Sequence, residues 1–445
     1  MDLLVAAAGF AILGTITGSI TGLIPGIHVN TIAVWAISAQ GSFSVMVSCW
    51  TGLSPSDGLI VLVIFLVSAM ISHEFTEIIP SVFLGAPDPD SSLTVYPGHR
   101  LLRRGLGYMA IVSSAAGTVM GALFAILLIV PLRALMGPPL NGYNLVEPFI
   151  PYILILIVFF IIMCERKTAL GRGWRARVTA LGVFMLSGAF GVIVLGSRGL
   201  EIRSEDTLFP IFTGLFGVST LIFSLRGKGG RIPRQKTPTL TQTLNTVKFG
   251  KKRSLKTIIS ALSGSLVSFF PGVTGAQATS VANLLTGGDA SKPESYIHHI
   301  SVIKISASIF SIMALFTIMK GRSGVAVAIS HIVPSLETWS SIIEPPRVLI
   351  LILFSMLIST LVSFFVLTSA GLIIARNIHK VNPGPLAIAV IIFLLIMVLI
   401  FTGLNGLLIL GVATSIGLLT QTLGVSRVHL MGVLILPVII YYLAI

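Results

Sequence analysis

Twelve apolar runs dominate the chain, and each is long enough to cross, or nearly cross, the hydrocarbon core of a lipid bilayer. They lie at about 3–24, 58–72, 108–136, 149–164, 178–197, 207–224, 257–271, 296–319, 347–374, 384–402, 404–422 and 430–444. Only 10% of the residues are charged and 54% are apolar, whereas a water-soluble domain carries about 25% charged residues. We therefore predict an all-α, polytopic integral membrane protein of the cell (plasma) membrane.

Four further apolar pieces, at about 27–38, 74–86, 273–287 and 324–340, are too short or too polar for ordinary spans. We expect them to be half-helices or re-entrant segments. Irregular backbone of this kind is tolerated at membrane depth only where protein or water satisfies its polar groups. The predicted fold therefore contains broken helices as well as complete spans.

One of these interruptions occurs twice in the sequence. Gly18-Ser19 is followed, after five residues, by Pro25-Gly26, and Gly264-Ser265 is followed at the same spacing by Pro271-Gly272. The corresponding residues differ in number by 246, a little over half of the 445 residues, which indicates a duplicated gene. Broken apolar segments in corresponding halves are the sequence feature that best indicates a transporter binding site.

The chemistry of the two Pro-Gly breaks suits an anion. A helix that restarts after a break presents unpaired N–H groups and the positive end of its dipole, which favour a carboxylate or phosphate. The alternative is a proline kink satisfied by neighbouring Ser and Thr side chains, but the repetition favours a binding site. The predicted substrate-binding residues are Pro25, Gly26, His28, Asn30 and Thr31 in the first copy, and Pro271, Gly272, Thr274, Gly275, Gln277 and Thr279 in the second.

The net charge of +14 is explained by orientation in the membrane better than by nucleic-acid binding. Five connections hold 21 of the 29 Lys and Arg residues, at 86–107, 165–177, 226–256, 375–382 and 423–429. The positive-inside rule places all five in the cytoplasm. Residues 226–256 carry ten of these basic residues and no acidic one, so we interpret this segment as a linker between a first membrane repeat, 1–225, and a second, 257–445.

The loop charges also predict how the two halves are oriented. The connection at 375–382 is basic, whereas its counterpart at 137–148 carries only Glu147 and is expected outside. The two halves are therefore predicted to be inverted structural repeats, which would bring the two breaks together near the membrane midplane.

His73, Glu74 and Glu77 place three ionisable groups within five residues directly after an apolar span. Ionisable residues inside a membrane are costly, and we predict that these three couple transport to a cation or proton. The alternative is that they mark the membrane edge. The His-Glu-x-x-Glu spacing lacks the second histidine of a zinc protease helix. In the second half, Lys304 is expected to reach the interface or to pair with an acid, and His298 and His299 to be interfacial.

Catalytic motifs are missing from the sequence. It has no nucleophile elbow, phosphate-binding loop, dinucleotide fingerprint or pair of catalytic carboxylates. We therefore predict that the chain is not an enzyme and binds no metal or cofactor, apart from Na⁺ or H⁺ as a coupling ion.

The stretch from Phe83 to Gly105, with Gly85-Ala-Pro87, small residues and Thr94, Pro97-Gly98 and a basic-Gly end, resembles a known family. The large membrane subunit of the tripartite tricarboxylate transporters has such a stretch, and a Pro-Gly motif near the start of each half. The resemblance implies carboxylate uptake by a secondary mechanism, with a small membrane subunit and an extracytoplasmic binding protein as partners. We also expect contacts with membrane lipids and a homo-oligomer.

The chain departs from the family pattern at its most distinctive positions. His28 and Asn30 follow the first Pro-Gly where the family continues with Gly-rich sequence. Asp88 and Asp90, with Pro89 between them, replace the acidic residue that usually follows Gly-x-Pro-Gly in the family. It resembles a divergent branch. Two other functions remain open. One is a polyprenyl-phosphate translocase, because Ile-Pro-Gly-x-x-x-Asn-Thr in this chain also resembles the opening motif of one such family. The other is an intramembrane enzyme that uses His73, Glu74 and Glu77.

Overall fold

The computed structural model describes residues 2–24, 29–85, 94–196, 204–226, 232–242, 251–270, 278–279, 292–333, 336–341 and 344–443. These residues are mostly helical, and the strands among them are a single short antiparallel pair. In the first half of the chain the elements are α1 (Leu3–Leu23), α2 (Val29–Thr51), α3 (Pro55–Thr76), α4 (Ile78–Phe83), α5 (Val95–Arg103), α6 (Gly107–Met136), α7 (Gly142–Val146), η2 (Glu147–Phe149), α8 (Ile150–Met163), β1 (Lys167–Thr168), β2 (Gly171–Arg172), α9 (Trp174–Gly196), α10 (Ser204–Phe212), η3 (Thr213–Val218) and α11 (Ser219–Arg226).

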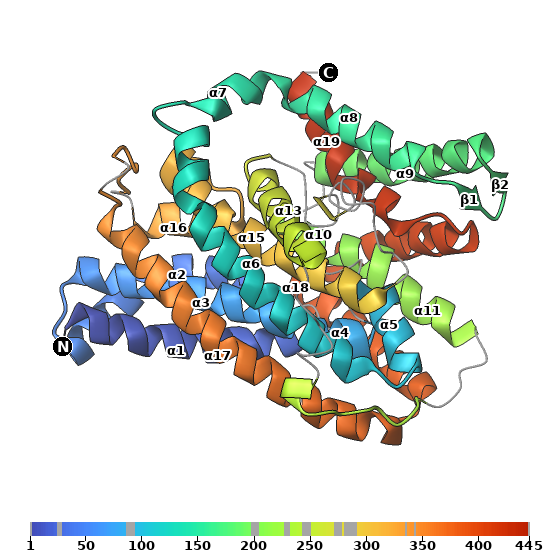
Figure 1. Cartoon of the computed structure of the whole chain (residues 1–445), viewed down its shortest axis with the longest axis horizontal. Coiled ribbons are helices and arrows are strands. Elements are labelled where there is room, and N and C mark those ends of the chain that lie inside the picture. Colours follow the sequence, from blue (N-terminus) through green and yellow to red (C-terminus); the bar gives the residue numbers. More distant parts are fainter. Residues whose placement is uncertain are drawn as a thin grey trace.

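The second half of the chain follows the linker (Figure 1). They are α13 (Lys251–Val267), α15 (Pro293–Ile318), α16 (Gly324–Ile332), α17 (Arg347–Asn377), η4 (Ile378–Lys380), α18 (Pro383–Thr422), η5 (Arg427–Met431) and α19 (Gly432–Leu443).

Ten helices within the described ranges are long and apolar enough to cross a membrane. Two shorter apolar helices, at 254–267 and 427–443, add to them. Since every backbone group inside a bilayer must be satisfied within the protein, an all-helical chain is the expected solution. The prediction of an all-α polytopic membrane protein is confirmed.

Two of the four short pieces differ from the expectation of half-helices. Within the piece at 27–38, the described residues begin at Val29 and form the start of α2, which continues to Thr51 and is long enough to span a bilayer. The piece at 74–86 continues α3 through the buried helix α4, and together they form an apolar span from Pro55 to Phe83. Polar residues lower the hydropathy of both pieces without ending their helices. Other helices bury α4 and the end of α3, whereas most of α2 is not buried.

The predicted separation of the runs 384–402 and 404–422 corresponds to a break within α18. Gly403 has φ 64° and ψ −161°, a backbone conformation that is essentially restricted to glycine. The helices on both sides are otherwise continuous, so α18 consists of two segments joined at this residue.

Small residues set the closest helix pairing in the first half. On α1, Gly14, Gly18 and Gly22 face α3 so closely that a Cβ atom at any of them would collide with α3. Ser19 on the same face shares a 2.6 Å hydrogen bond with Ser72. Packing of small residues is the usual basis of helix association in membranes. It holds the end of α1 against the C-terminal end of α3.

Buried side chains form two main cores, and each core draws on both halves of the chain. The first core contains α2, α3 and α6 from the first half and α15, α16 and α17 from the second. The second core contains α8, α9, α10 and η3 together with the later part of α18, η5 and α19. Figure 1 shows α1, α2, α3 and α17 on one side of the molecule and α8, α9 and α19 on the other. The two halves are thus interleaved.

The basic connections meet one another in space. The amide of Lys236 donates to the carbonyl of Gly105 at 2.8 Å, and the amide of Ala169 donates to the carbonyl of Leu423 at 2.7 Å. His429 lies 3.1 Å from a carboxylate oxygen of Glu165. Connections from both halves therefore lie at the same end of the helices, here called the basic end, as a shared cytoplasmic location requires.

Candidate functional site

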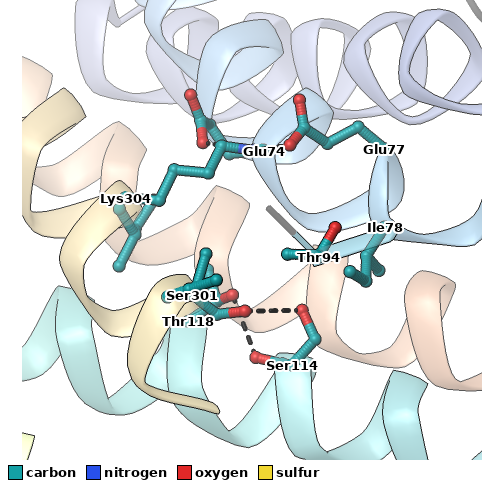
Figure 2. A pocket seen from close by; sticks show the side chains of 10 residues that line it. Glu74, Glu77, Ile78, Thr94, Ser114, Thr118, Ser301 and Lys304 are labelled. Atoms are coloured by element: carbon teal, nitrogen blue, oxygen red, sulfur yellow. Dashed lines mark hydrogen bonds and ion pairs between the residues drawn. The ribbon is translucent and has the colours of Figure 1, made fainter. Parts of the chain in front are cut away.

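Three charged side chains meet between α3 and α15 (Figure 2). Glu74 lies in the last turn of α3, Glu77 caps that helix, and Lys304 lies in the middle of α15. The Lys304 ammonium is 3.0 Å from Oε2 of Glu74 and also forms an ion pair with Glu77. We call Glu74, Glu77 and Lys304 the ion cluster. Its side chains are only 12%, 5% and 8% exposed, so the charges are removed from water.

Hydrogen bonds fix the remaining carboxylate and histidine atoms around the ion cluster. Ser308, one turn along α15 from Lys304, donates to Oε1 of Glu74 at 2.9 Å. His73 lies 3.7 Å from the Glu77 carboxylate, and its Nδ1 is 3.2 Å from the Thr21 hydroxyl. The three predicted coupling residues are therefore brought together, with a lysine from the other half of the chain as their partner.

At formal charges the ion cluster has an excess of negative charge, because two carboxylates face one ammonium. Uncompensated charge is costly in a low-dielectric interior, so such a group favours the uptake of a cation or proton. Protonation of His73 or of one carboxylate, or binding of a monovalent cation, would neutralise it.

A small cavity adjoins the ion cluster. Its volume is about 10 Å³, which is about enough for one water molecule. Ser301 of α15 and Ser114 of α6 share a 2.8 Å hydrogen bond beside it, and Thr118 donates to the Ser114 carbonyl (Figure 2). The hydroxyl-lined space suits a water or a bare cation but is too small for an organic anion.

The end of α1, which precedes the first Pro-Gly motif, lies next to the ion cluster. Helix α1 ends at Leu23, two residues before Pro25, and α2 begins at Val29. The last turn of α1 contacts α3 through Thr21 and His73, and a Cβ atom on Gly22 would overlap Thr76. The end of α1 that precedes the first Pro-Gly motif therefore lies at the end of α3 that carries Glu74 and Glu77, and residues 25–28 lie outside the described residues.

The second break is flanked by residues that contact α15 beside Lys304. Helix α13 ends at Val267, four residues before Pro271, and Val267 packs with Ala278 against Ile303. Gly264 of α13 also approaches the backbone of Ile303. The described residues on both sides of the second Pro-Gly motif therefore contact α15 at Ile303, the residue that precedes Lys304.

The predicted substrate-binding residues are only partly described. Thr279 is buried, with 1% of its surface exposed, and Asn30 and Thr31 lie in the first turn of α2. The remaining predicted residues lie outside the described residues: Pro25, Gly26, His28, Pro271, Gly272, Thr274, Gly275 and Gln277.

His298 and His299 are buried, not interfacial as expected. His298 is 0% and His299 8% exposed. His298 lies 3.3 Å from the Thr257 hydroxyl and 3.3 Å from the Ser113 carbonyl, and His299 lies 3.2 Å from the Ser260 hydroxyl. Packing of α13 and α6 against α15 covers both rings.

Several site residues could not be identified from the sequence. Ser308, Ser114, Ser301 and Thr118 are small polar residues of a kind found throughout membrane helices, and only their position beside the ion cluster distinguishes them. Lys304 did carry a signal, since it is a cation in the middle of an apolar span. Within the described residues, no group of three or more His, Cys, Asp or Glu is placed to hold a metal ion.

Comparison with known proteins agrees with this architecture. The model of the tripartite tricarboxylate transporter TctA family matches residues 9–432. An uncharacterized protein of Methanocaldococcus jannaschii is 32% identical over 442 residues, which cover 98% of this chain and 98% of that protein. No solved structure matches the chain. The chain therefore belongs to the tripartite tricarboxylate transporter TctA family, and it is a multi-pass transporter subunit of the cell membrane.

Proposed function

We propose that this subunit is a secondary active transporter of small organic anions, chiefly carboxylates, coupled to H⁺ or Na⁺. The observation that carries the proposal is the ion cluster, in which two carboxylates share one ammonium between α3 and α15. Its net negative charge allows it to bind one cation. His73, Glu74 and Glu77 are the proposed coupling residues, and Lys304 is the counter-ion that keeps both carboxylates ionised in the apolar interior.

The anion is proposed to bind at the paired Pro-Gly breaks. Helix α2 begins immediately after the first break, so its N-terminal dipole favours a carboxylate there. Asn30, Thr31, Thr274 and Gln277 are the proposed hydrogen-bonding partners. The cation at the ion cluster and the anion at the breaks would then lie close enough for each to favour binding of the other.

The helix contacts support an inverted repeat. Helix α1 packs on α3 as α13 packs on α15, and α17 contacts α1 and α3 as α6 contacts α13 and α15. When the two halves are exchanged in the same way, the contact of α9 with α19 corresponds to the contact of η3 with α18. This reciprocity is what two repeats related by a two-fold axis produce. Helix α1 starts away from the basic end, whereas α13 starts within the basic linker at Lys251, as opposite orientations require.

We propose that the subunit works with a small membrane subunit and an extracytoplasmic binding protein, as the tripartite family description implies. Uptake measurements must therefore be made both with and without these partners. The proposed subunit is a permease and not an enzyme, because the family is one of transporters.

Uptake of radiolabelled citrate into proteoliposomes tests the proposal. We expect accumulation when an H⁺ or Na⁺ gradient is imposed and none when it is dissipated. The His28→Ala and Asn30→Ala variants should change the relative uptake of mono-, di- and tricarboxylates. Ser38→Ala, at an exposed position further along α2, is the matched control and should leave selectivity unchanged.

Two outcomes would count against the proposal. In the first, no carboxylate accumulates with either gradient, and the reconstituted protein flips a polyprenyl-phosphate carrier. That result would favour the translocase. The other is unchanged selectivity in both variants, which would place the anion site elsewhere.

A further inference from the structure

Three hydroxyl groups beside the ion cluster can act only as hydrogen-bond acceptors. Ser114 and Thr118 of α6 and Ser301 of α15 are buried and line the small cavity. The Ser301 hydroxyl donates to the Ile297 carbonyl at 3.0 Å, and the Thr118 hydroxyl donates to the Ser114 carbonyl at 3.0 Å. Because the Ser301 proton is used in this way, Ser114 is the donor in the 2.8 Å bond between the two serines. Each oxygen therefore keeps lone pairs but has no proton left to donate.

A group that only donates hydrogen bonds fits such a cavity. Its volume of about 10 Å³ is about enough for one water molecule, and an ammonium group is similar to water in size. Glu74, Glu77 and Lys304 line the same cavity. Figure 2 shows the two carboxylates on one side of this space and the three hydroxyls on the other. The cavity therefore offers acceptors for an ammonium group directly beside the ammonium of Lys304.

The Lys304 ammonium occupies the carboxylate oxygens that a coupling cation needs. Oε2 of Glu74 and Oε1 of Glu77 both contact it, and neither oxygen has another hydrogen-bond partner among the described residues. Two cations at the same oxygens repel each other strongly in a buried site. A coupling cation that binds these oxygens must therefore replace the ammonium there.

We propose that the Lys304 ammonium has two positions and that its movement between them opens the cation site. In the described structure it lies between the carboxylates of Glu74 and Glu77. When the coupling cation binds there, the ammonium moves into the small cavity and donates to the hydroxyls that line it. Ser301 lies three residues before Lys304 on α15, so both residues share one helix face, within reach of the flexible lysine side chain. The inference rests on the coupling function proposed for the ion cluster.

The charges of the ion cluster explain why the two positions alternate. At formal charges, two carboxylates and one ammonium leave one negative charge. A bound monovalent cation neutralises that charge and weakens the attraction that holds the ammonium between the carboxylates. In the cavity, the hydroxyl oxygens satisfy the donors of the displaced ammonium, so that its charge is not left without partners. When the cation leaves, the ammonium returns and closes the site.

Lys304→Arg separates the charge of this residue from its movement. The guanidinium still supplies a positive charge between the two carboxylates, but it is too large for a cavity that holds about one water molecule. We expect cation binding to weaken at least tenfold, because the carboxylate oxygens are then permanently occupied.

A second variant blocks the cavity and leaves the lysine in place. Ser301→Thr keeps the hydroxyl and adds one methyl group, and we expect it to weaken cation binding at least fivefold. Combining it with Thr118→Ser, which removes a methyl group from the α6 side of the same cavity, should recover the binding. Ser295→Thr adds a methyl group to a serine of α15 that does not line the cavity, and this matched control should leave binding unchanged.

Cation binding is measured on the purified full chain in detergent without citrate. Na⁺ replaces choline at constant ionic strength and pH, and the rise of the unfolding midpoint gives the half-saturating concentration. Proton binding is measured without Na⁺, by potentiometric titration between about pH 8 and 6, the range in which histidines and strongly shifted carboxylates titrate. The cation that binds the unmodified protein but not Glu77→Gln is then followed through the other variants.

Unweakened cation binding in Lys304→Arg, or a double variant that binds no better than Ser301→Thr, would overturn the proposed movement. Absence of Na⁺ and proton binding at Glu77 in the unmodified protein would also overturn it. If Lys304→Arg does not fold, the Ser301→Thr variant and its double variant decide the question. The expected binding pattern without citrate uptake in proteoliposomes would reject the proposed transport function and leave the lysine movement in place. Gradient-driven uptake combined with unweakened binding in Lys304→Arg would do the reverse.

Discussion

The ammonium of Lys304 is shared between Glu74, at 3.0 Å, and Glu77, although the lysine and the two acids belong to opposite halves of the chain. The arrangement joins the two halves of the chain between α3 and α15. It also replaces bulk water as the stabiliser of two buried carboxylates.

Replacing Lys304 by methionine should be strongly destabilising. The substitution leaves two buried carboxylates without a counter-ion, and we expect the free energy of unfolding to fall by about 3–5 kcal/mol. Adding Glu74→Gln and Glu77→Gln to Lys304→Met should recover most of the loss, because no buried charge remains. Thermal unfolding of the purified protein in detergent measures both effects.

Lys320→Met is the matched control for that experiment. Lys320 also pairs with a glutamate, Glu147, but their side chains are 43% and 33% exposed. An exposed pair contributes about 0–1 kcal/mol. If Lys304→Met and Lys320→Met lower the free energy of unfolding equally, the claim that the buried ion cluster contributes more stability than an exposed ion pair is wrong.

Gly403→Ala should destabilise the protein by about 1–3 kcal/mol, because alanine is strained at φ 64° and ψ −161°. An added Cβ would meet no neighbouring atom there, so the cost is conformational. Gly411→Ala, in the same helix with equally open surroundings, should be neutral or stabilising. Thermal unfolding of the two variants compares them directly, and similar midpoints would argue against the break in α18.

Arg133→Lys should destabilise the segment that precedes α17. The Arg133 guanidinium is buried, stacks over the Trp339 ring at 5.3 Å, and donates to the carbonyls of Trp339, Ser340 and Pro138. Lysine cannot reproduce this planar set of donors, and we expect a loss of about 2–4 kcal/mol. Arg347→Lys, at an exposed position, should change the unfolding midpoint little.

His99 should make stability depend on pH. Burial, reinforced by Arg427 and Arg103, lowers the pKa of His99 to about 4. At pH values between about 4 and 6.5, the His99 imidazole binds a proton in the unfolded chain but not in the folded chain. Stability should therefore fall as the pH decreases from about 6.5 to 4, by at most about 3 kcal/mol from this residue. His99→Gln should remove that part of the pH dependence of the unfolding midpoint, whereas an unchanged profile would contradict it.

Hydropathy and loop charge were sufficient to predict the helices and the grouping of the basic connections. The boundary at Gly403 was also visible, because glycine separates two apolar runs of membrane length. Helix α2 was predicted too short, because Gln40, Gly41 and several serines lower the hydropathy of its later part. Its buried side chains lie against α3 and α16, and a single sequence does not show such contacts.

The candidate site could be predicted only as separate pieces. His73, Glu74 and Glu77 are recognisable because ionisable residues are rare inside membranes. Their pairing with Lys304 depends on the close approach of α3 and α15, which long-range packing determines.

The central claim is that the ion cluster couples cation binding to anion uptake. Its most direct test is the rate of citrate uptake into proteoliposomes under an imposed H⁺ or Na⁺ gradient, compared between the unmodified protein, Glu77→Gln and the control Asp57→Asn. Asp57 lies at the opposite end of α3 from the ion cluster. We predict that one gradient accelerates uptake at least tenfold in the unmodified protein and in Asp57→Asn, and that Glu77→Gln loses this acceleration. Undiminished acceleration in Glu77→Gln would contradict the claim.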